Sequence, residues 1–333
     1  DGTPYADPAE MSLRCFAAAQ HAGIGITILP TLYAFGGFGG QDPLPGQRRF
    51  LNHAERFLKI VGNLSIQAKG SALRHVGISP HSLRAVTPEL LREVIAALPP
   101  DAPIHVHVAE QVKEVEDCLA FSGRRPVELL MESFELSDRW TAIHATHMTP
   151  DESARAARSG AVAGLCPSTE ANLGDGIFDA PSWLKADGRW GVGSDSHVCV
   201  SAAQELMLLE YSQRLATRQR NVLATAEQPS VATAMTLAAV AGGAQASARP
   251  VAGLAAGQQA DLLVLDAQHL LLRDLPSPEA MLSAHVFASH RQSALQQVWV
   301  GGRLLVQSGR HALHDSALSG GVDARQQLLK NTP

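Results

Sequence analysis

Cysteine and clustered positive charge are both scarce in this sequence. The 333 residues include 4 cysteines, none in a CxxC spacing, and the formal net charge of -5 comes without any block of lysine and arginine. Scattered cysteines argue against a disulfide framework or a zinc ribbon and fit reduced thiols in the cytoplasm. Without a basic patch to neutralise phosphates, we expect no nucleic-acid partner.

Long apolar runs are also missing. The chain has no run of about 18 apolar residues, and residues 1–7 carry neither the basic segment nor the apolar core of a signal peptide. We therefore expect no membrane span, no secretion and a cytoplasmic location. At 45% hydrophobic and 18% charged residues, the composition still provides for a large buried core, in one barrel or in two ordinary domains.

The chain does contain a regular alternation of short apolar runs with longer helical patterns. Repeated βα units of this kind build a parallel sheet. The six apolar runs that predict strands cover residues 25–32, 76–79, 104–108, 141–145, 161–166 and 190–194. The helical patterns between them, with Pro, Ser or Asp near their starts, include residues 88–98, 112–120, 126–134 and 150–159.

The pattern changes after the sixth run. Two helical stretches follow, at 201–218 and 230–246, and short strands with Gly turns at 253–266 and 298–309 then predict a small β region. A parallel barrel usually closes with about eight strands, so six leave an open edge. The alternation alone fits an open, doubly wound sheet as well as a barrel whose first two units lie outside this chain.

The most informative motif is His105-Val-His107-Val-Ala-Glu110 at the end of the third predicted strand. Strand alternation places the two imidazoles on one face, and Glu110 falls in the following loop, where barrel enzymes hold their chemistry. Neutral imidazoles are good zinc or iron ligands, and a nearby carboxylate can move protons. Taken alone, two histidines on one strand face are more often hydrogen-bonded structural groups.

Two further strands end in candidate residues. His144 lies at the end of the fourth predicted strand, and Asp195 follows the sixth in Gly-Ser-Asp-Ser-His. A polar group at a strand end lowers stability unless it is paired, so successive coincidences at one edge favour a site. For Asp195 a helix N-cap or an Asx turn stays open as the structural alternative.

His81 and Arg84 follow the second predicted strand in Ser-Pro-His-Ser-Leu-Arg. Arginine is the natural bidentate partner of a substrate carboxylate. The alternative is a solvated Arg84 paired with Glu89 or Asp101. Two loops have weaker signals: residues 35–46 are rich in Gly and Pro and long enough to cover a site, and residues 166–176 fit an ordinary connection as well as a substrate contact.

Together, the His-x-x-Glu of one strand, the histidine of the next and the Ser-Asp of the last resemble the deaminase branch of the amidohydrolase superfamily. Residues 253–262 resemble the return strand of that family's β-sandwich. The resemblance implies an α/β fold: a (β/α)8 TIM-like barrel of the metal-dependent hydrolase type, with strands 3 to 8 in residues 1–249, and part of a small β-sandwich in residues 250–333.

Carried over by position, the resemblance makes His107 a metal ligand and Glu110 the proton shuttle. It places His144 beside the attacking water and makes Asp195 a ligand or base for that water. The implied cofactor is one divalent metal, zinc or alternatively iron. Departing from the family, this chain has no His-x-His strand before Gly25, so we expect the first two barrel units and half of the metal ligands to lie outside it.

Within that branch the motifs are most similar to the formimidoylglutamate deiminase family of histidine breakdown. The implied reaction converts N-formimino-L-glutamate to N-formyl-L-glutamate and ammonia, with His81 and Arg84 holding the carboxylate-bearing part of this small-molecule substrate. A homodimer is compatible with this reading, and no membrane partner is implied. The alternatives are another deaminase, acting on guanine or a thioadenosine, and a non-catalytic barrel remnant that serves as an interaction protein.

Overall fold

The computed structural model describes residues 3–288 and 293–330. Its elements follow one another in the order α1 (Glu10–Ala22), β1 (Ile26–Ile28), β2 (Thr31–Leu32), η1 (Pro45–Phe50), α2 (Ala54–Ala68), β3 (Arg74–Val76), β4 (Ser79–Pro80), α3 (Pro88–Ala96), β5 (Ile104–Val108), α4 (Val112–Ser122), α5 (Pro126–Ser133), β6 (Trp140–His144), α6 (Pro150–Arg158), β7 (Val162–Leu165), α7 (Pro167–Leu173), α8 (Ala180–Lys185), β8 (Arg189–Val192), α9 (Ala202–Thr217), α10 (Val231–Ala246), β9 (Leu262–Leu265), α11 (Pro278–Ala288), β10 (Leu295–Val300), β11 (Arg303–Gln307), β12 (Arg310–His311) and α12 (His314–Lys330).

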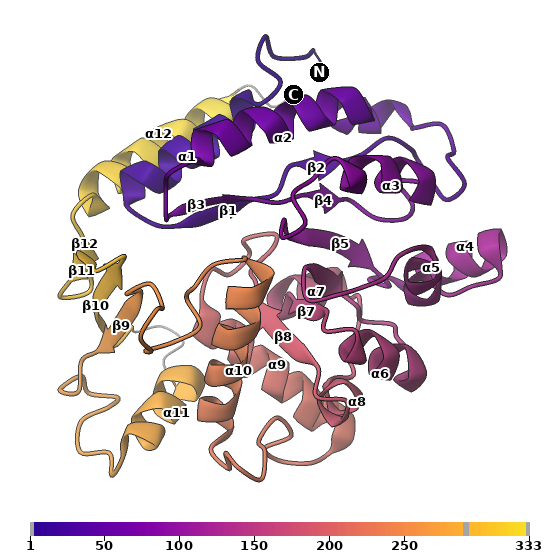
Figure 1. Cartoon of the computed structure of the whole chain (residues 1–333). Coiled ribbons are helices and arrows are strands. Elements are labelled where there is room, and N and C mark those ends of the chain that lie inside the picture. The colour runs from indigo at the N-terminus through magenta and orange to yellow at the C-terminus, as the bar shows by residue number, and fades with distance from the viewer. Residues whose placement is uncertain (1–2, 289–292, 331–333) are drawn as a thin grey trace.

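The six predicted strand regions pair side by side and in parallel. β1 pairs with β3, β2 pairs with β4, and β5 to β8 form a four-stranded sheet in sequence order. A parallel bridge between Ile78 and Ile104 connects the two groups (Figure 1). Each of the first two strands is split into two short pieces, and the first split falls at Pro30, which has no N–H to donate to a ladder.

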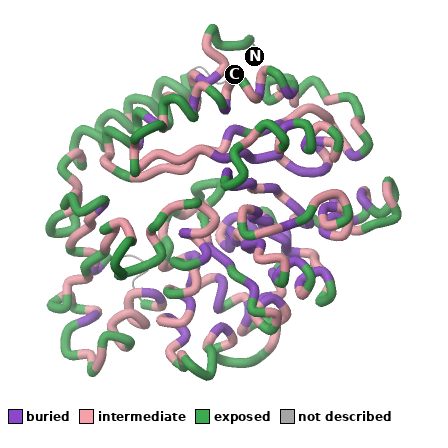
Figure 2. Tube along the Cα trace, viewed as in Figure 1, coloured by how far each residue is buried: buried purple, intermediate pink, exposed green. Residues whose placement is uncertain are grey.

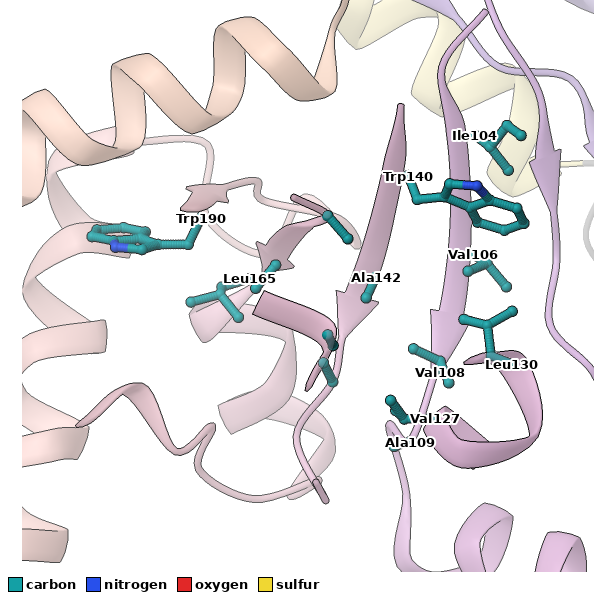
Figure 3. Packing of buried hydrophobic residues seen from close by; sticks show 14 of the residues in the cluster. Ile104, Val106, Val108, Ala109, Val127, Leu130, Trp140, Ala142, Leu165 and Trp190 are labelled. Atoms are coloured by element: carbon teal, nitrogen blue, oxygen red, sulfur yellow. The ribbon is translucent and has the colours of Figure 1, made fainter. Parts of the chain in front are cut away.

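β5 shows how the sequence separates core from site. Its burial alternates: Ile104, Val106 and Val108 are buried, whereas His105 and His107 are half-buried. The apolar face packs against α5, where Leu130 lies beside Val106 and Val108 (Figure 3). Because a fully buried Val or Leu contributes about 1.5 to 3 kcal/mol, this face fixes the strand and directs both imidazoles to the opposite side.

α10 lies along β8 at very short range (Figure 1). A Cβ atom at Gly242 would stand 1.9 Å from the carbonyl oxygen of Trp190, and one at Gly191 would stand 3.1 Å from the backbone nitrogen of Gly243. Glycine on both elements therefore permits the helix and the strand to touch backbone to backbone. This contact places α10 beside the last parallel strand.

The last part of the chain forms a four-stranded antiparallel sheet in the order β12-β11-β10-β9. The antiparallel sheet reaches back to the first helix: His311 of β12 donates a hydrogen bond from Nε2 to the carbonyl oxygen of Ala22, the last residue of α1, at 3.1 Å. Figure 1 shows α12 after this sheet at the end of the chain. α11 and α12 were not predicted. α12 has no buried side chain, so its sequence lacks the apolar stripe that marks a packed helix.

Burial is concentrated in the parallel strands and the helices around them, whereas α1 and α12 are largely exposed (Figure 2). In the parts of the chain that the structure describes, no helix has both the length and the apolar character to span a membrane.

Candidate active site at the carboxyl edge of the parallel sheet

His107, Glu110, His144 and Asp195 lie together at the carboxyl ends of β5, β6 and β8. The rings of His107 and His144 have centroids 5.6 Å apart. The Nε2 atom of His144 is 3.8 Å from a carboxylate oxygen of Glu110 and 3.8 Å from one of Asp195. The structure thus brings the four residues to one place, as expected for side chains that follow neighbouring parallel strands.

The ring of His107 is held in one orientation by the segment after β4. Its Nδ1 donates a hydrogen bond to the carbonyl oxygen of His81 at 2.8 Å, and the two imidazole rings are 5.0 Å apart. This bond leaves Nε2 as the bare nitrogen. Burial lowers the pKa of His107, and burial together with His107 and Arg84 lowers the pKa of His81 to about 4. Both rings are therefore neutral at pH 7, the form that binds metals.

His144 is 1% exposed, and a carboxylate binds the ring nitrogen that faces away from Glu110 and Asp195. Its Nδ1 donates to Oε1 of Glu170 at 3.2 Å, and the same oxygen accepts the backbone N–H of Cys166 at 2.8 Å. Burial by itself lowers the pKa of His144. The hydrogen bond to Glu170 and the charges of Glu110, Glu170 and Asp195 outweigh burial, and the pKa is raised. His144 is therefore the site imidazole that accepts a proton most readily.

Several backbone positions at this edge adopt the left-handed region, which is uncommon for residues with a side chain. The φ angles are 52° at Ala109, 66° at His144, 50° at Ala145 and 48° at Asp195. Such conformations cost about 1 to 3 kcal/mol each and cluster at functional sites. The N-cap alternative for Asp195 is wrong, because α9 begins at Ala202 and the side chain of Ser201 caps it.

Glu114 on α4 fixes the turn that carries Glu110. Its buried carboxylate accepts the backbone N–H groups of Ala109 at 3.1 Å and of Glu110 at 3.0 Å. Burial raises the pKa of Glu114, although Arg84 and the two backbone donors oppose this shift. A left-handed residue at the end of β5 is thus stabilised by a side chain from the next helix.

Arg84 lies beside the same acidic groups. Its Nη2 is 3.8 Å from Glu110 and 3.9 Å from Glu114, and its buried Nε has no hydrogen-bond acceptor among the described residues. The predicted alternative, a pair with Glu89 or Asp101, is wrong, since Glu89 instead pairs with Arg92 at 3.3 Å. Arg84 therefore carries one buried donor that no described residue satisfies.

A hollow of about 600 Å³ begins at Arg84 and runs between α4 and the loop that was expected to cover a site. Within that loop Phe38 is buried and stacks on Phe121 of α4 with ring centroids 6.0 Å apart. A Cβ at Gly39, where φ is 76°, would stand 2.5 Å from the Phe121 ring. The loop is thereby fastened to α4 beside Arg84.

The donor set at this edge suits a divalent metal. One ligand atom each from His144, Cys166 and Asp195 lies within 4.8 Å of the others, and the bare Nε2 of His107 belongs to the neighbouring ring. Imidazole nitrogen and carboxylate oxygen are common zinc ligands. Burial, reinforced by Glu170 and Asp195, raises the pKa of the Cys166 thiol, which favours the protonated form that binds metals poorly.

Three other histidines near the motifs lie differently. His105 donates from Nε2 to the carbonyl oxygen of Ala246 at 2.8 Å, and His147 donates from Nε2 to that of Asp175 at 2.7 Å. His197 is exposed. The first two therefore have structural hydrogen bonds. The sequence analysis did not single out Glu114 or Glu170. Residues 166–176 were predicted to be a loop, which is wrong for most of the segment, because Pro167–Leu173 form α7 and Glu170 lies on that helix.

Comparison with known proteins places these features in a family context. The sequence profile of the amidohydrolase family matches residues 10–305. The chain is 49% identical over 331 residues to formimidoylglutamate deiminase of Pseudomonas aeruginosa, spanning 99% of this chain and 72% of that protein. It is 30% identical over 242 residues to 5-methylthioadenosine/S-adenosylhomocysteine deaminase of Nitratidesulfovibrio vulgaris, spanning 72% and 53%.

Solved structures agree on the fold. An amidohydrolase from Brucella melitensis superposes with a TM-score of 0.94 at 48% identity, over 99% of this chain and 72% of that chain. An adenosine deaminase from Xanthomonas campestris with bound zinc superposes with a TM-score of 0.77 at 19% identity, over 95% and 69%. The predicted fold class, a TIM-like barrel region with a small antiparallel sheet, is confirmed.

Proposed function

This chain belongs to the amidohydrolase family, and on that premise we propose that it is a deiminase that hydrolyses N-formimino-L-glutamate to N-formyl-L-glutamate and ammonia. The observation that carries the proposal is the placement of His144 between the carboxylates of Glu110 and Asp195, with Arg84 beside Glu110. The identity of 49% to a formimidoylglutamate deiminase supports the substrate. The reaction would serve histidine degradation.

The residues present fit a divalent metal, zinc in the first place and iron as the alternative. His107 would bind through Nε2, because its Nδ1 is engaged with the His81 carbonyl oxygen. Asp195, whose side chain is 38% exposed, would bind through its carboxylate. When bound, such a metal lowers the pKa of water toward about 7 and makes hydroxide available at neutral pH.

Glu110 handles the proton in this proposal. Water oxygen adds to the formimino carbon, while Glu110 takes the proton that water loses and passes it to the imino nitrogen. Glu110 next takes the proton of the new hydroxyl group and passes it to the same nitrogen, so the carbon–nitrogen bond breaks, ammonia leaves, and the carbonyl of the formyl group forms. Nε2 of His144, which is bare in the neutral ring, and the carboxylate of Asp195 orient the water, since the two atoms lie 3.8 Å apart.

Arg84 and His81 hold the glutamate part of the substrate. The buried Nε of Arg84 has no acceptor within the described residues, and a substrate carboxylate would supply one. His81 is kept neutral, its pKa being lowered to about 4 by burial, His107 and Arg84, so it donates or accepts a hydrogen bond without adding charge. A neutral purine could offer Arg84 only uncharged acceptors, whereas a carboxylate forms a charge-assisted hydrogen bond, which favours the carboxylate substrate.

An ammonia-release assay tests the proposal. It is run on two zinc-loaded proteins, the 333-residue chain and the product of the full reading frame that encodes it. N-formimino-L-glutamate, guanine and 5-methylthioadenosine are tested as parallel substrates. We expect release from formimino-glutamate with a kcat/KM at least about 100-fold above that for either purine. Release only from a purine, or from none of the three by either protein, would contradict the proposal.

A further inference from the structure

We propose that Glu170 is a positioning residue that holds His144 in the tautomer with a bare Nε2. The expected effect on catalysis rests on the proposed function, whereas the hydrogen bonds that fix the tautomer do not depend on it. The side chain of Glu170 is 6% exposed, so its hydrogen bonds are shielded from water. A buried carboxylate without partners would be strongly unfavourable, and here His144 and a backbone amide are the donors.

One oxygen of Glu170 carries both bonds. Oε1 accepts the backbone N–H of Cys166 at 2.8 Å and the Nδ1 proton of His144 at 3.2 Å. A backbone amide can only donate, so it fixes an acceptor at that position. The nitrogen of His144 that faces this acceptor must therefore carry the proton, and in the neutral ring Nε2 is left bare.

The bare nitrogen points to where the chemistry is expected. Nε2 of His144 is 3.8 Å from both Glu110 and Asp195, too far for direct hydrogen bonds and spaced for a group between them. In the other tautomer Nε2 would donate and could no longer accept a hydrogen bond from water. Partners that fix a ring tautomer typically change activity by about 10- to 100-fold when removed.

α7 offers a matched comparison for Glu170. Glu205 of α9 is a second buried carboxylate, and it accepts the backbone N–H of Ser168 at 2.9 Å and the hydroxyl of Ser168 at 2.6 Å. It thus stabilises the start of the same short helix without contacting His144. An effect that comes only from loosening α7 should appear in Glu205→Ala as well as in Glu170→Ala.

The test uses ¹⁵N NMR of histidine-labelled, zinc-loaded protein at a pH where the ring is neutral. Because the chain has 14 histidines, His144→Asn identifies the signal of His144. We expect the wild type and Glu205→Ala to show a protonated Nδ1 and a bare Nε2. Glu170→Ala should lose that preference, and Glu170→Gln should keep it, because its amide oxygen can accept from Cys166 and His144 at once.

Kinetics supply the second measurement. We expect Glu170→Ala to lower kcat by about 10- to 100-fold with KM within about threefold, and Glu170→Gln to restore most of the loss. An unchanged His144 tautomer in Glu170→Ala would overturn the proposal, and so would equal tautomer changes in Glu170→Ala and Glu205→Ala. The tautomer is read without substrate, so a failure of the proposed substrate would leave this result intact and distinguishable.

Discussion

His107 donates its Nδ1 proton to the carbonyl oxygen of His81 across 2.8 Å. The bond joins the ends of two neighbouring strand regions and decides which nitrogen of His107 faces the site. It also connects the two sequence motifs: His107 presents the ligand atom Nε2, and the backbone carbonyl of His81 fixes the orientation of that ring. The proposed metal ligand His107, the proton shuttle Glu110 and the substrate-binding Arg84 thus all depend on the same end of the parallel strands.

Replacing Glu110 by Gln should remove proton transfer and leave the metal in place. We expect kcat to fall by about 10² to 10⁴ because the amide cannot carry the proton. Steady-state kinetics with metal analysis of the same sample measure this. Glu116→Gln, at an exposed position of α4, serves as the control. Near-normal turnover in Glu110→Gln would rule out the shuttle.

Replacing Arg84 by Met should weaken binding of a carboxylate substrate. A hydrogen bond to a charged group contributes about 1.5 to 3 kcal/mol, so KM for formimino-glutamate should rise by about 10- to 100-fold. Arg92→Met is the matched control, since Arg92 is 53% exposed and pairs with Glu89 at the surface. Equal KM values for wild type and Arg84→Met would exclude a role for Arg84 in binding the substrate carboxylate.

His105 should make stability depend on pH. Burial lowers its pKa below the ordinary 6.5, so the unfolded chain binds this proton more tightly than the folded chain does. The contribution of His105 to the free energy of unfolding is therefore fully present above about pH 6.5 and is lost as the pH falls through the folded-state pKa. His105→Gln can still donate to Ala246, and urea unfolding at several pH values should show a flatter profile. Identical slopes in both proteins would contradict this account.

The contact between α10 and β8 makes a stability prediction with an internal control. A methyl group at Gly242 would meet the Trp190 backbone, so Gly242→Ala should lower the free energy of unfolding by about 1 to 3 kcal/mol. A Cβ at Gly243 meets nothing within 4 Å, and Gly243→Ala should stabilise the helix by about 0.5 to 1 kcal/mol. Urea titrations compare the two, and equal effects would show that the close contact is not maintained.

The convergence of the main candidates could be predicted because strand geometry is local. Alternation of apolar and polar residues assigns His107 to the face opposite the core, and parallel pairing brings the end of its strand beside His144. Glu114 and Glu170 could not be assigned in the same way. Their partners are set by how the following helix docks, which no short spacing in the sequence records.

Helices with weak patterns escaped prediction for a related reason. α12 buries no side chain, and α11 buries only Val286 among its described residues, so neither presents a clear apolar stripe. The division of the chain near residue 249 stays a prediction. The class of fold is confirmed. It could be predicted because the repeated βα alternation is strong over many residues.

Anomalous diffraction at the zinc edge, from crystals grown with zinc, tests the central claim most directly. We predict a peak bonded to Nε2 of His107 and to the carboxylate of Asp195, at about 2.0 to 2.2 Å from each. His144 should lie beside this peak and keep its contact with Glu170. A zinc peak bonded to neither His107 nor Asp195, or no peak at this strand edge, would contradict the account.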